Sequence, residues 1–408
     1  MDTQHIRHLT LRNYKSIESC SIDLAPLTIF VGRNGVGKSN ILDALRFVAE
    51  SLSTTLEFAI RERGGIDLVR RKSLGGRPTH PGVRLEIKTS TGSADYAFRI
   101  AAVSGFGFRV DEERCRILDA HGRVLNEFAV EDEKVTKWTL ASASPAVSPD
   151  RLFLVAASGQ PQFREVWDIL RRMTFHNLNP EAMKLPSRPE PGELLAPDGH
   201  NIASVVKHLR ENEPDELDRV LGFMRAIGVP LAKVSHKQAG ALETIEVSQL
   251  IDVEGGVRNS NFDAASLSDG TLRALGILVS LASASAKSNR HTGPSLIGIE
   301  EPETALHPAA AGALMEALVE GSERTQLLLS CHSPDLVDHP RITAEMIRPV
   351  VIENGKTMVG RLGNERARLL REHLSTAGEL LRLDQLSPDP EDIKRQAAQG
   401  SLFEGFAS

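Results

Sequence analysis

The sequence predicts an α/β fold, in which a mixed β-sheet carries an antiparallel β-subdomain and a helical insertion. Three observations support this prediction. The apolar run at residues 27–31, typical of a buried strand, precedes a glycine-rich turn and then apolar residues at helical spacing. Residues 83–127 contain short alternating stretches, which are typical of antiparallel strands. Between about residues 150 and 235 the pattern becomes helical.

The other elements follow from local patterns. Residues 6–11 alternate between apolar and polar side chains, which predicts a half-buried strand, and residues 22–24 predict a second. Asn354-Gly355 between two apolar stretches is a strong hairpin signal. The polar residues after 383 predict a frayed tail. Further helices are expected at 166–173, 203–209, 216–227, 269–284, from Pro308 onward and at 366–383, and further strands at 244–253, 296–299 and 327–329.

The length of 408 residues is enough for two or three domains, or for one α/β domain with a large insertion. We expect an N-terminal lobe with the glycine-rich loop and the antiparallel β-subdomain at 1–110. A mostly helical insertion at 111–240 should follow. The second lobe is expected at 241–365, and a C-terminal helix and tail at 366–408.

The composition excludes several kinds of site. The 48 basic and 54 acidic residues give a net charge of −6, so no uniformly basic surface indicates nucleic acid. Aromatic residues make up only 4%, which disfavours a base-stacking RNA platform. Cys20, Cys115 and Cys331 lie far apart without a CxxC pair, which argues against a zinc ribbon or a redox dithiol.

Targeting and membrane signals are missing from the sequence pattern. The first residues lack the apolar core of a signal peptide, and no run of about 18 apolar residues occurs. The widely spaced cysteines are typical of a reducing compartment. We therefore expect a cytoplasmic protein with no membrane partner.

Residues 32–39 match the phosphate-loop (Walker A) pattern GxxxxGK[ST]. Glycines let backbone N–H groups converge on phosphate oxygens, a lysine supplies a point charge, and a serine hydroxyl is a hard ligand for Mg²⁺. Because the pattern lies between a buried strand and a helix, it predicts binding of ATP with Mg²⁺ rather than an ordinary turn. The predicted nucleotide contacts are Gly32, Asn34, Gly35, Val36, Gly37, Lys38, Ser39 and Asn40, with Ser39 also on the metal.

Carboxylates end the apolar strand at 296–299. A phosphate-loop site needs one carboxylate for the shell of Mg²⁺ and another group to orient or deprotonate water. We assign Glu300 to magnesium and Glu301 to the attacking water, with Glu303 as a supporting residue. Adjacent strand residues point to opposite faces, which fits two different roles. Glu300 stands where such sites usually carry Asp, and acidic residues also end strands without any catalytic role.

Ser266-Leu-Ser-Asp-Gly-Thr-Leu-Arg273 precedes another helical pattern. Taken alone, Ser268 is an N-cap, and with Gly270 it opens a helix whose N-terminus suits an anion. Together with the two preceding motifs, the segment resembles the signature of ABC-type ATPases. That resemblance implies a P-loop NTPase fold of the ABC-ATPase type. It also implies that Ser266, Ser268 and Gly270 of one protomer complete the nucleotide site of the other.

Other segments agree with this resemblance. His332 matches the switch histidine of ABC-type ATPases, and residues 303–308 lie where that class has its D-loop, at the contact between the two protomers. Asn13-Tyr-Lys-Ser16 resembles an N-terminal segment of the SMC and RecF branch, which makes Lys15 a candidate nucleotide contact or, equally, an exposed strand-end lysine. The whole set is similar to bacterial ABC/SMC-type predicted AAA ATPases near the RecF and OLD (overcoming lysogenisation defect) families, without a Toprim domain.

The resemblance implies an ATPase that closes as a homodimer on ATP and opens on hydrolysis. Its candidate partners are DNA and a nuclease or toxin effector encoded nearby, in genome maintenance or phage defence. Two alternatives remain, an ATPase subunit of an ABC transporter and a nucleotide-gated binding module with negligible turnover. The signature departs from the transporter form Leu-Ser-Gly-Gly-Gln, and Glu301 is a residue that a pure sensor does not need.

Overall fold

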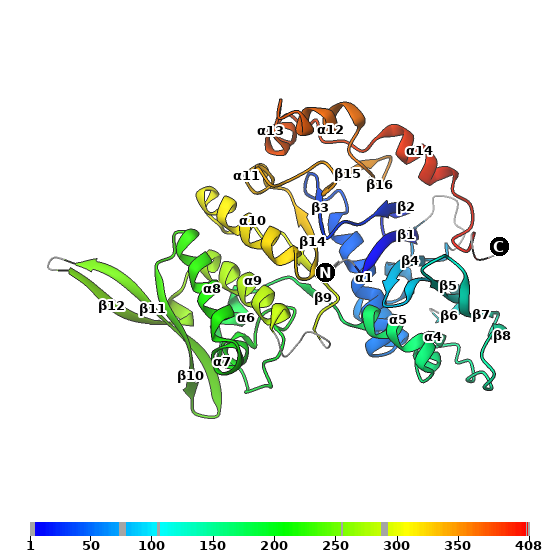
Figure 1. Cartoon of the computed structure of the whole chain (residues 1–408), viewed down its shortest axis with the longest axis horizontal. Coiled ribbons are helices and arrows are strands. Elements are labelled where there is room, and N and C mark those ends of the chain that lie inside the picture. The colour runs from blue at the N-terminus through cyan, green and yellow to red at the C-terminus, as the bar shows by residue number, and fades with distance from the viewer. Residues whose placement is uncertain are drawn as a thin grey trace. The chain divides into compact units, whose positions relative to one another are not determined.

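The structure, a computed structural model, describes residues 5–72, 79–103, 107–253, 256–286, 293–404 and 406. The chain divides into two compact units. We call residues 2–173, 343–374 and 384–408 the P-loop unit, and residues 174–342 and 375–383 the signature unit. The division does not follow chain order, because the C-terminal residues return to the P-loop unit (Figure 1).

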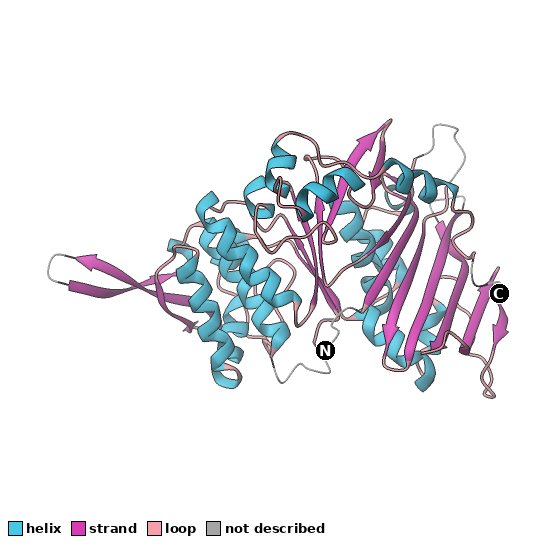
Figure 2. Ribbon diagram, turned by 45° about the horizontal axis from the view of Figure 1, so that its top comes forward, coloured by secondary structure: helices cyan, strands magenta, loops and turns pink. Residues whose placement is uncertain are grey.

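The P-loop unit is built on a seven-stranded antiparallel sheet of order β2-β1-β4-β5-β6-β7-β8 (Figure 2). A second group of strands has β3 parallel to β15 and β15 antiparallel to β16. The strands are β1 (Ile6–Tyr14), β2 (Ile17–Asp23), β3 (Leu27–Val31), β4 (Gly82–Thr89), β5 (Gly92–Val103), β6 (Gly107–Asp119), β7 (Val124–Glu131), β8 (Lys134–Trp138), β15 (Ile347–Glu353) and β16 (Lys356–Val359). The helices are α1 (Lys38–Ser53), α2 (Leu56–Glu62), α3 (Ile66–Val69), α4 (Phe153–Ala157), α5 (Pro161–Arg171), α12 (Asn364–Arg371) and α14 (Pro390–Ala398).

One face of the antiparallel sheet is covered by α1 and α5, which buries large aromatic rings. Phe47 of α1 lies 5.9 Å from the Tyr14 ring and 6.3 Å from the Phe98 ring. Phe163 of α5 lies 5.2 Å from the Phe128 ring. Full burial of each phenylalanine stabilises the fold by roughly 1.5–3 kcal/mol, so these contacts fix the two helices to the sheet.

The opposite face of the sheet is covered by the C-terminal residues, so the predicted frayed tail is wrong. Phe403 lies under the guanidinium groups of Arg99 and Arg114, each 5.5 Å from the ring centre. Phe406 lies under Arg84 and Arg116 at 5.0 and 5.3 Å. These cation–π contacts bury both rings, although the tail looks polar in sequence.

Two other predicted elements differ in extent from the structure. Residues 107–138 continue the antiparallel sheet as β6–β8, so the helices of the expected insertion begin only at Phe153. The expected helix at 366–383 is split into α12 and α13 (Ala377–Arg382). The break falls where His373 adopts a φ of 53° and Thr376 begins a new helix with a capping box to Glu379.

The signature unit is a helical group around α9, with a parallel strand pair and an antiparallel three-stranded sheet. β13 is parallel to β14, with β9 next to β13, and β10-β11-β12 form the separate sheet, which extends beyond α7 and α8 (Figure 1). The strands are β9 (Met173–His176), β10 (Leu231–Ala239), β11 (Leu242–Val253), β12 (Gly256–Asp263), β13 (Leu296–Glu300) and β14 (Gln326–Cys331). The helices are α6 (Pro180–Lys184), α7 (Ile202–Asn212), α8 (Pro214–Ala226), α9 (Asp269–Ser285), α10 (Pro308–Ser322), α11 (Pro334–Val337) and α13.

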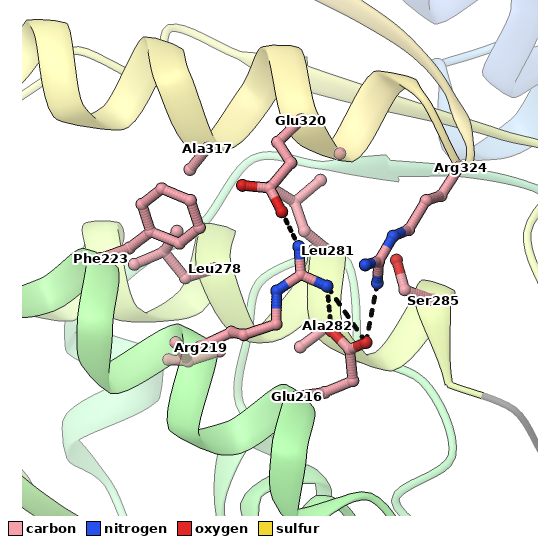
Figure 3. A pocket seen from close by; sticks show the side chains of 12 residues that line it. Glu216, Arg219, Phe223, Leu278, Leu281, Ala282, Ser285, Ala317, Glu320 and Arg324 are labelled. Carbon is pink, nitrogen blue, oxygen red and sulfur yellow. Dashed lines mark hydrogen bonds and ion pairs between the residues drawn. The ribbon is translucent and has the colours of Figure 1, made fainter.

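Ion pairs join α8 to the α10 region over the apolar surface of α9. Glu216 accepts from Arg324 at 2.7 Å, and Arg219 bridges Glu216 and Glu320 (Figure 3). Beneath them Leu278 and Leu281 line a small hollow. This hollow contains none of the residues predicted to bind nucleotide.

The predicted mixed α/β class is confirmed, because parallel and antiparallel pairs occur together. In the described part of the chain, no helix combines the length and the apolar character needed to cross a membrane.

Candidate functional site

The phosphate loop connects β3 to α1 in the P-loop unit. Gly35 and Gly37 have φ values of 81° and 101°, the left-handed region that glycine adopts without strain. Helix α1 begins at Lys38, whose ammonium group donates to the carbonyl oxygens of Gly32 at 2.7 Å and Arg33 at 2.9 Å. The loop thus curls around its own lysine at the N-terminus of a 16-residue helix. This arrangement suits an anion, because the N–H groups and the dipole at a helix N-terminus favour negative charge there.

The hairpin β15–β16 packs against the two outer glycines of the motif. A Cβ atom on Gly32 would lie 2.2 Å from the carbonyl oxygen of Val350, and one on Gly37 would lie 2.2 Å from Oγ1 of Thr357. Both glycines are therefore required by their protein neighbours, in addition to the phosphate role that the motif predicts. The sequence motif gives no sign of this second requirement.

Lys15 lies in the P-loop unit with its ammonium group engaged by a carboxylate. Its Nζ is 2.6 Å from Oδ2 of Asp43, and the same oxygen accepts from the Tyr14 hydroxyl at 2.7 Å. The other oxygen, Oδ1, pairs with Arg63 at 2.9 Å. Burial alone would raise the pKa of Asp43, but Arg63 and Lys15 outweigh it and the pKa is lowered. A nucleotide contact by Lys15 would require it to leave this ion pair, and stays a prediction.

In the signature unit, the acidic segment turns sharply after Glu300. Glu300 is the last residue of β13, and Glu301 has a φ of 45° with its N–H donating to the carbonyl oxygen of Ser330 at 3.0 Å. The strand alternation that we used to separate the two carboxylates therefore does not extend to Glu301. The Glu301 side chain is 40% exposed, so solvent reaches its carboxylate.

Glu303 connects the acidic segment to the predicted switch histidine. Its Oε1 accepts from the backbone N–H groups of His332 at 2.7 Å and Ser333 at 3.1 Å. The ring Nδ1 of His332 lies 3.2 Å from this oxygen and 3.8 Å from Oε1 of Glu301. The structure thus brings Glu301 and His332 together. Glu303, which the sequence indicated only as a supporting residue, is the group that joins their two segments.

The signature segment opens α9 as predicted. Ser268 is the exposed N-cap, and its Oγ accepts from the N–H of Thr271 at 3.2 Å. Ser266 ends a short 3-10 turn and is also exposed. Gly270 is buried, and a Cβ there would lie 2.1 Å from the carbonyl oxygen of Ala305. The D-loop segment therefore packs directly on the start of α9.

Family models match both parts of the chain. Residues 5–87 match "AAA ATPase domain", and residues 175–338 match "AAA domain, putative AbiEii toxin, Type IV TA system". Both descriptions are of AAA ATPase domains, and together with the RecF relatives they support an ABC/SMC-type AAA ATPase near RecF.

Curated relatives of this chain include the DNA replication and repair protein RecF of two bacteria. The RecF protein of Bifidobacterium adolescentis is 30% identical over 164 residues, which is 40% of this chain and 37% of that protein. The RecF protein of Kineococcus radiotolerans is 46% identical over 46 residues, which is 11% of this chain and 12% of that protein. The chain thus spans only a part of the length of the curated relatives that it matches.

A solved structure shares the fold of this chain. It is the Smc head domain with an extended coiled coil bound to the C-terminal domain of ScpA, from Pyrococcus furiosus. The TM-score is 0.50 at 14% identity, and the match covers 91% of this chain and 99% of that one. The predicted P-loop NTPase fold of the ABC-ATPase type is confirmed.

Proposed function

We propose that this chain binds ATP with Mg²⁺ at residues 32–40 and hydrolyses it to ADP and phosphate. The observation that carries the proposal is the conformation of the phosphate loop. Left-handed Gly35 and Gly37 turn the backbone around Lys38 at the start of a long helix. A triphosphate fits such a turn, because N–H groups, the helix dipole and the lysine all offer positive charge to it.

The other residues have roles that follow from their chemistry. Ser39 in the first turn of α1 and Glu300 at the end of β13 offer the hard oxygen ligands that Mg²⁺ prefers. When bound, Mg²⁺ neutralises charge on the phosphate oxygens. Glu301 orients the attacking water and accepts its proton, and His332 donates a hydrogen bond to the γ-phosphate. Glu303 holds the backbone of His332 in place.

We also propose that two copies associate on ATP. Ser268 lies exposed at the N-terminus of the 17-residue helix α9, where a phosphate group is favoured, and Ser266 is exposed beside it. In this proposal Ser266, Ser268 and Gly270 act on the nucleotide bound by the second copy. A two-fold dimer then has two composite sites, each with the same parts.

DNA is the proposed target of this ATP-dependent association. Support comes from the RecF relatives, whose name is DNA replication and repair protein. The family description over residues 175–338 favours a second candidate, a role in a toxin–antitoxin system. In either role, ATP binding and turnover would control when the protein engages its target.

A mixing experiment tests the composite site. Lys38→Ala and Ser268→Arg should each be inactive, the first because it loses ATP and the second because bulk and charge obstruct the association. In an equimolar mixture about half of the dimers are mixed, and each has one intact site, so ATPase activity should approach about a quarter of the wild-type value.

Ser268→Ala is the gentler control, because it removes the hydroxyl without adding charge. The composite site would be ruled out if neither mixture exceeded its parents while size measurements confirmed that protomers exchange.

A further inference from the structure

The hairpin β15–β16 brings a threonine to the phosphate loop. Thr357 of β16 lies opposite Ile352 and is only 1% exposed. Its N–H donates to the carbonyl oxygen of Ser16 at 3.0 Å, and its hydroxyl donates to the carbonyl oxygen of Val36 at 2.7 Å. Thr357 therefore connects the loop to the turn after β1, within the P-loop unit.

Counting protons gives the direction of the hydrogen bonds around Thr357. A hydroxyl group has one proton, and that of Thr357 goes to Val36. Ser16 Oγ lies 2.7 Å from Thr357 Oγ1 and must therefore be the donor in this pair. The proton of Ser16 is then used, so Ser16 accepts from Nδ2 of Asn40 at 2.7 Å. The result is a chain of hydrogen bonds from Asn40 through Ser16 and Thr357 to Val36, which we call the hydroxyl chain.

The hydroxyl chain begins and ends within residues 36–40, so it closes a ring around Gly37 and Lys38. Thr357 also fills the space beside Gly37, where a Cβ atom would meet its Oγ1 at 2.2 Å. A loop that is held in its binding curvature before the ligand arrives loses less entropy on binding. The ring therefore fixes the separation of Val36 and Asn40, and with it the start of α1.

We propose that Ser16 and Thr357 are positioning residues that preorganise the phosphate loop for the triphosphate of ATP. This inference rests on the proposed function of residues 32–40. Neither residue is assigned a contact with nucleotide. Both act through the loop, so they should affect the affinity for ATP and leave the chemical step nearly unchanged. The Asn354-Gly355 turn, with φ values of 50° and 72°, then serves to place Thr357.

The test is Thr357→Val, which keeps the shape of the side chain and removes the hydroxyl. The Kd of a fluorescent ATP analogue and the KM for ATP should both rise about 10-fold, the factor that corresponds to 1.4 kcal/mol. The kcat at saturating ATP should stay within about twofold of wild type, since the chemistry is not touched. Thr357→Ser keeps the hydroxyl and should restore wild-type affinity.

Thr89→Val is the matched control. Thr89 is a buried strand residue of the same unit, and its hydroxyl has no hydrogen-bond partner among the described residues. Ser16→Ala breaks the same chain at its other member. The double variant of Ser16→Ala and Thr357→Val should lose no more affinity than the single variant with the greater loss, because both changes break the same hydroxyl chain. Ser16→Ala decides the question alone if Thr357→Val does not fold.

A measurement without nucleotide separates this inference from the proposed function. Hydrogen exchange of the backbone amides of residues 36–40 should be faster in Thr357→Val and unchanged in Thr89→Val. Unchanged exchange together with a Kd within about twofold of wild type would overturn the positioning role. A different outcome would instead overturn ATP as the ligand of the loop. In it, amide exchange differs between wild type and Thr357→Val, but the wild-type protein does not bind the analogue.

Discussion

The phosphate loop of the P-loop unit and the acidic segment of the signature unit are held in different ways. The loop places its positive φ values on glycines, and side chains on both sides hold it by hydrogen bonds. The acidic segment places positive φ values on Glu301 and Ala305, at 45° and 65°. Left-handed backbone at such residues costs roughly 1–2 kcal/mol each, so this segment is strained where the loop is relaxed.

The two regions also differ in how their charged groups are satisfied. Lys38 is 4% exposed and donates to two carbonyl oxygens. Glu301 is 40% exposed, and Oε2 of the buried Glu303 side chain has no hydrogen-bond partner among the described residues. The phosphate loop is thus held in its curvature by the protein itself, whereas the acidic segment retains unused hydrogen-bonding capacity at Glu303. Substitutions in the two regions should therefore separate affinity from turnover.

Glu301→Gln should give the largest separation between affinity for ATP and turnover. The amide has the shape of the carboxylate but cannot accept a proton, and a positioned base contributes roughly 10²–10⁴-fold to the rate. Steady-state ATPase assays should show that loss in kcat, while the Kd of the ATP analogue stays close to wild type. Light scattering with ATP and Mg²⁺ should then detect a larger mass than without nucleotide. If the variant kept the wild-type turnover, the catalytic base would have to be Glu300 or Glu303 instead.

Glu303→Ala should give an intermediate effect. The change removes the acceptor for the N–H groups of His332 and Ser333, and each buried N–H without a partner costs about 1–3 kcal/mol. We expect kcat to fall about 10-fold, with little change in affinity, because the switch histidine is displaced while the phosphate loop is intact. Glu303→Gln, which retains an acceptor oxygen, should recover much of the rate. Equal losses in both variants would show that the charge, and not the acceptor, matters.

The smallest expected effect concerns a buried carboxyl group in the P-loop unit. Glu113 is fully buried and, like Glu303, accepts from two consecutive N–H groups, those of Phe153 at 2.5 Å and Leu154 at 2.8 Å. Burial raises its pKa to about 7, because the N–H groups and the Tyr96 hydroxyl only partly offset the loss of water. The folded state then binds more protons than the unfolded state between about pH 4.5 and 7.

Stability from Glu113 is therefore fully present below pH 4.5 and is lost as the pH rises through 7. Thermal melts of wild type should therefore fall across this window, by about 2–4 °C for each kcal/mol that is lost in a unit of this size. Glu113→Gln should remove the dependence on pH, whereas Glu57→Gln at an exposed position should keep it. If the melting temperature of Glu113→Gln depended on pH as in wild type, the dependence would belong to another group.

The elements that local pattern defines were predicted well. Residues 27–31 form β3 as expected, and α1 follows the glycine-rich loop, because a buried strand, a turn and an amphipathic helix each leave a signal within a few residues. The hairpin at Asn354-Gly355 and the N-cap at Ser268 were predicted for the same reason. The split of the last predicted helix also had a local signal, the capping box of Thr376 and Glu379, which our pattern analysis missed.

The features that depend on distant partners were not predictable in this way. Phe403 and Phe406 are buried only because arginines of β4, β5 and β6 lie above them. Thr357 carries no motif, the motif around Ser16 drew attention only to Lys15, and the two hydroxyl groups meet only in the folded chain. The segment around Lys15 drew attention through its resemblance to the SMC and RecF branch, yet Lys15 pairs with Asp43 and its neighbour Ser16 is the residue that bonds to the start of α1.

The hydroxyl chain also constrains the order of events during synthesis. Val36 and Thr357 are 321 residues apart, so at about 5–20 residues per second the ribosome adds the threonine roughly 16–64 s after the loop it holds. During that interval the nascent chain contains the complete glycine-rich motif but lacks the β15–β16 hairpin that packs against it. An N-terminal fragment that ends before β15 always lacks this hairpin. The full affinity that we propose for nucleotide is thus acquired late in translation, although the residues of the motif are made early.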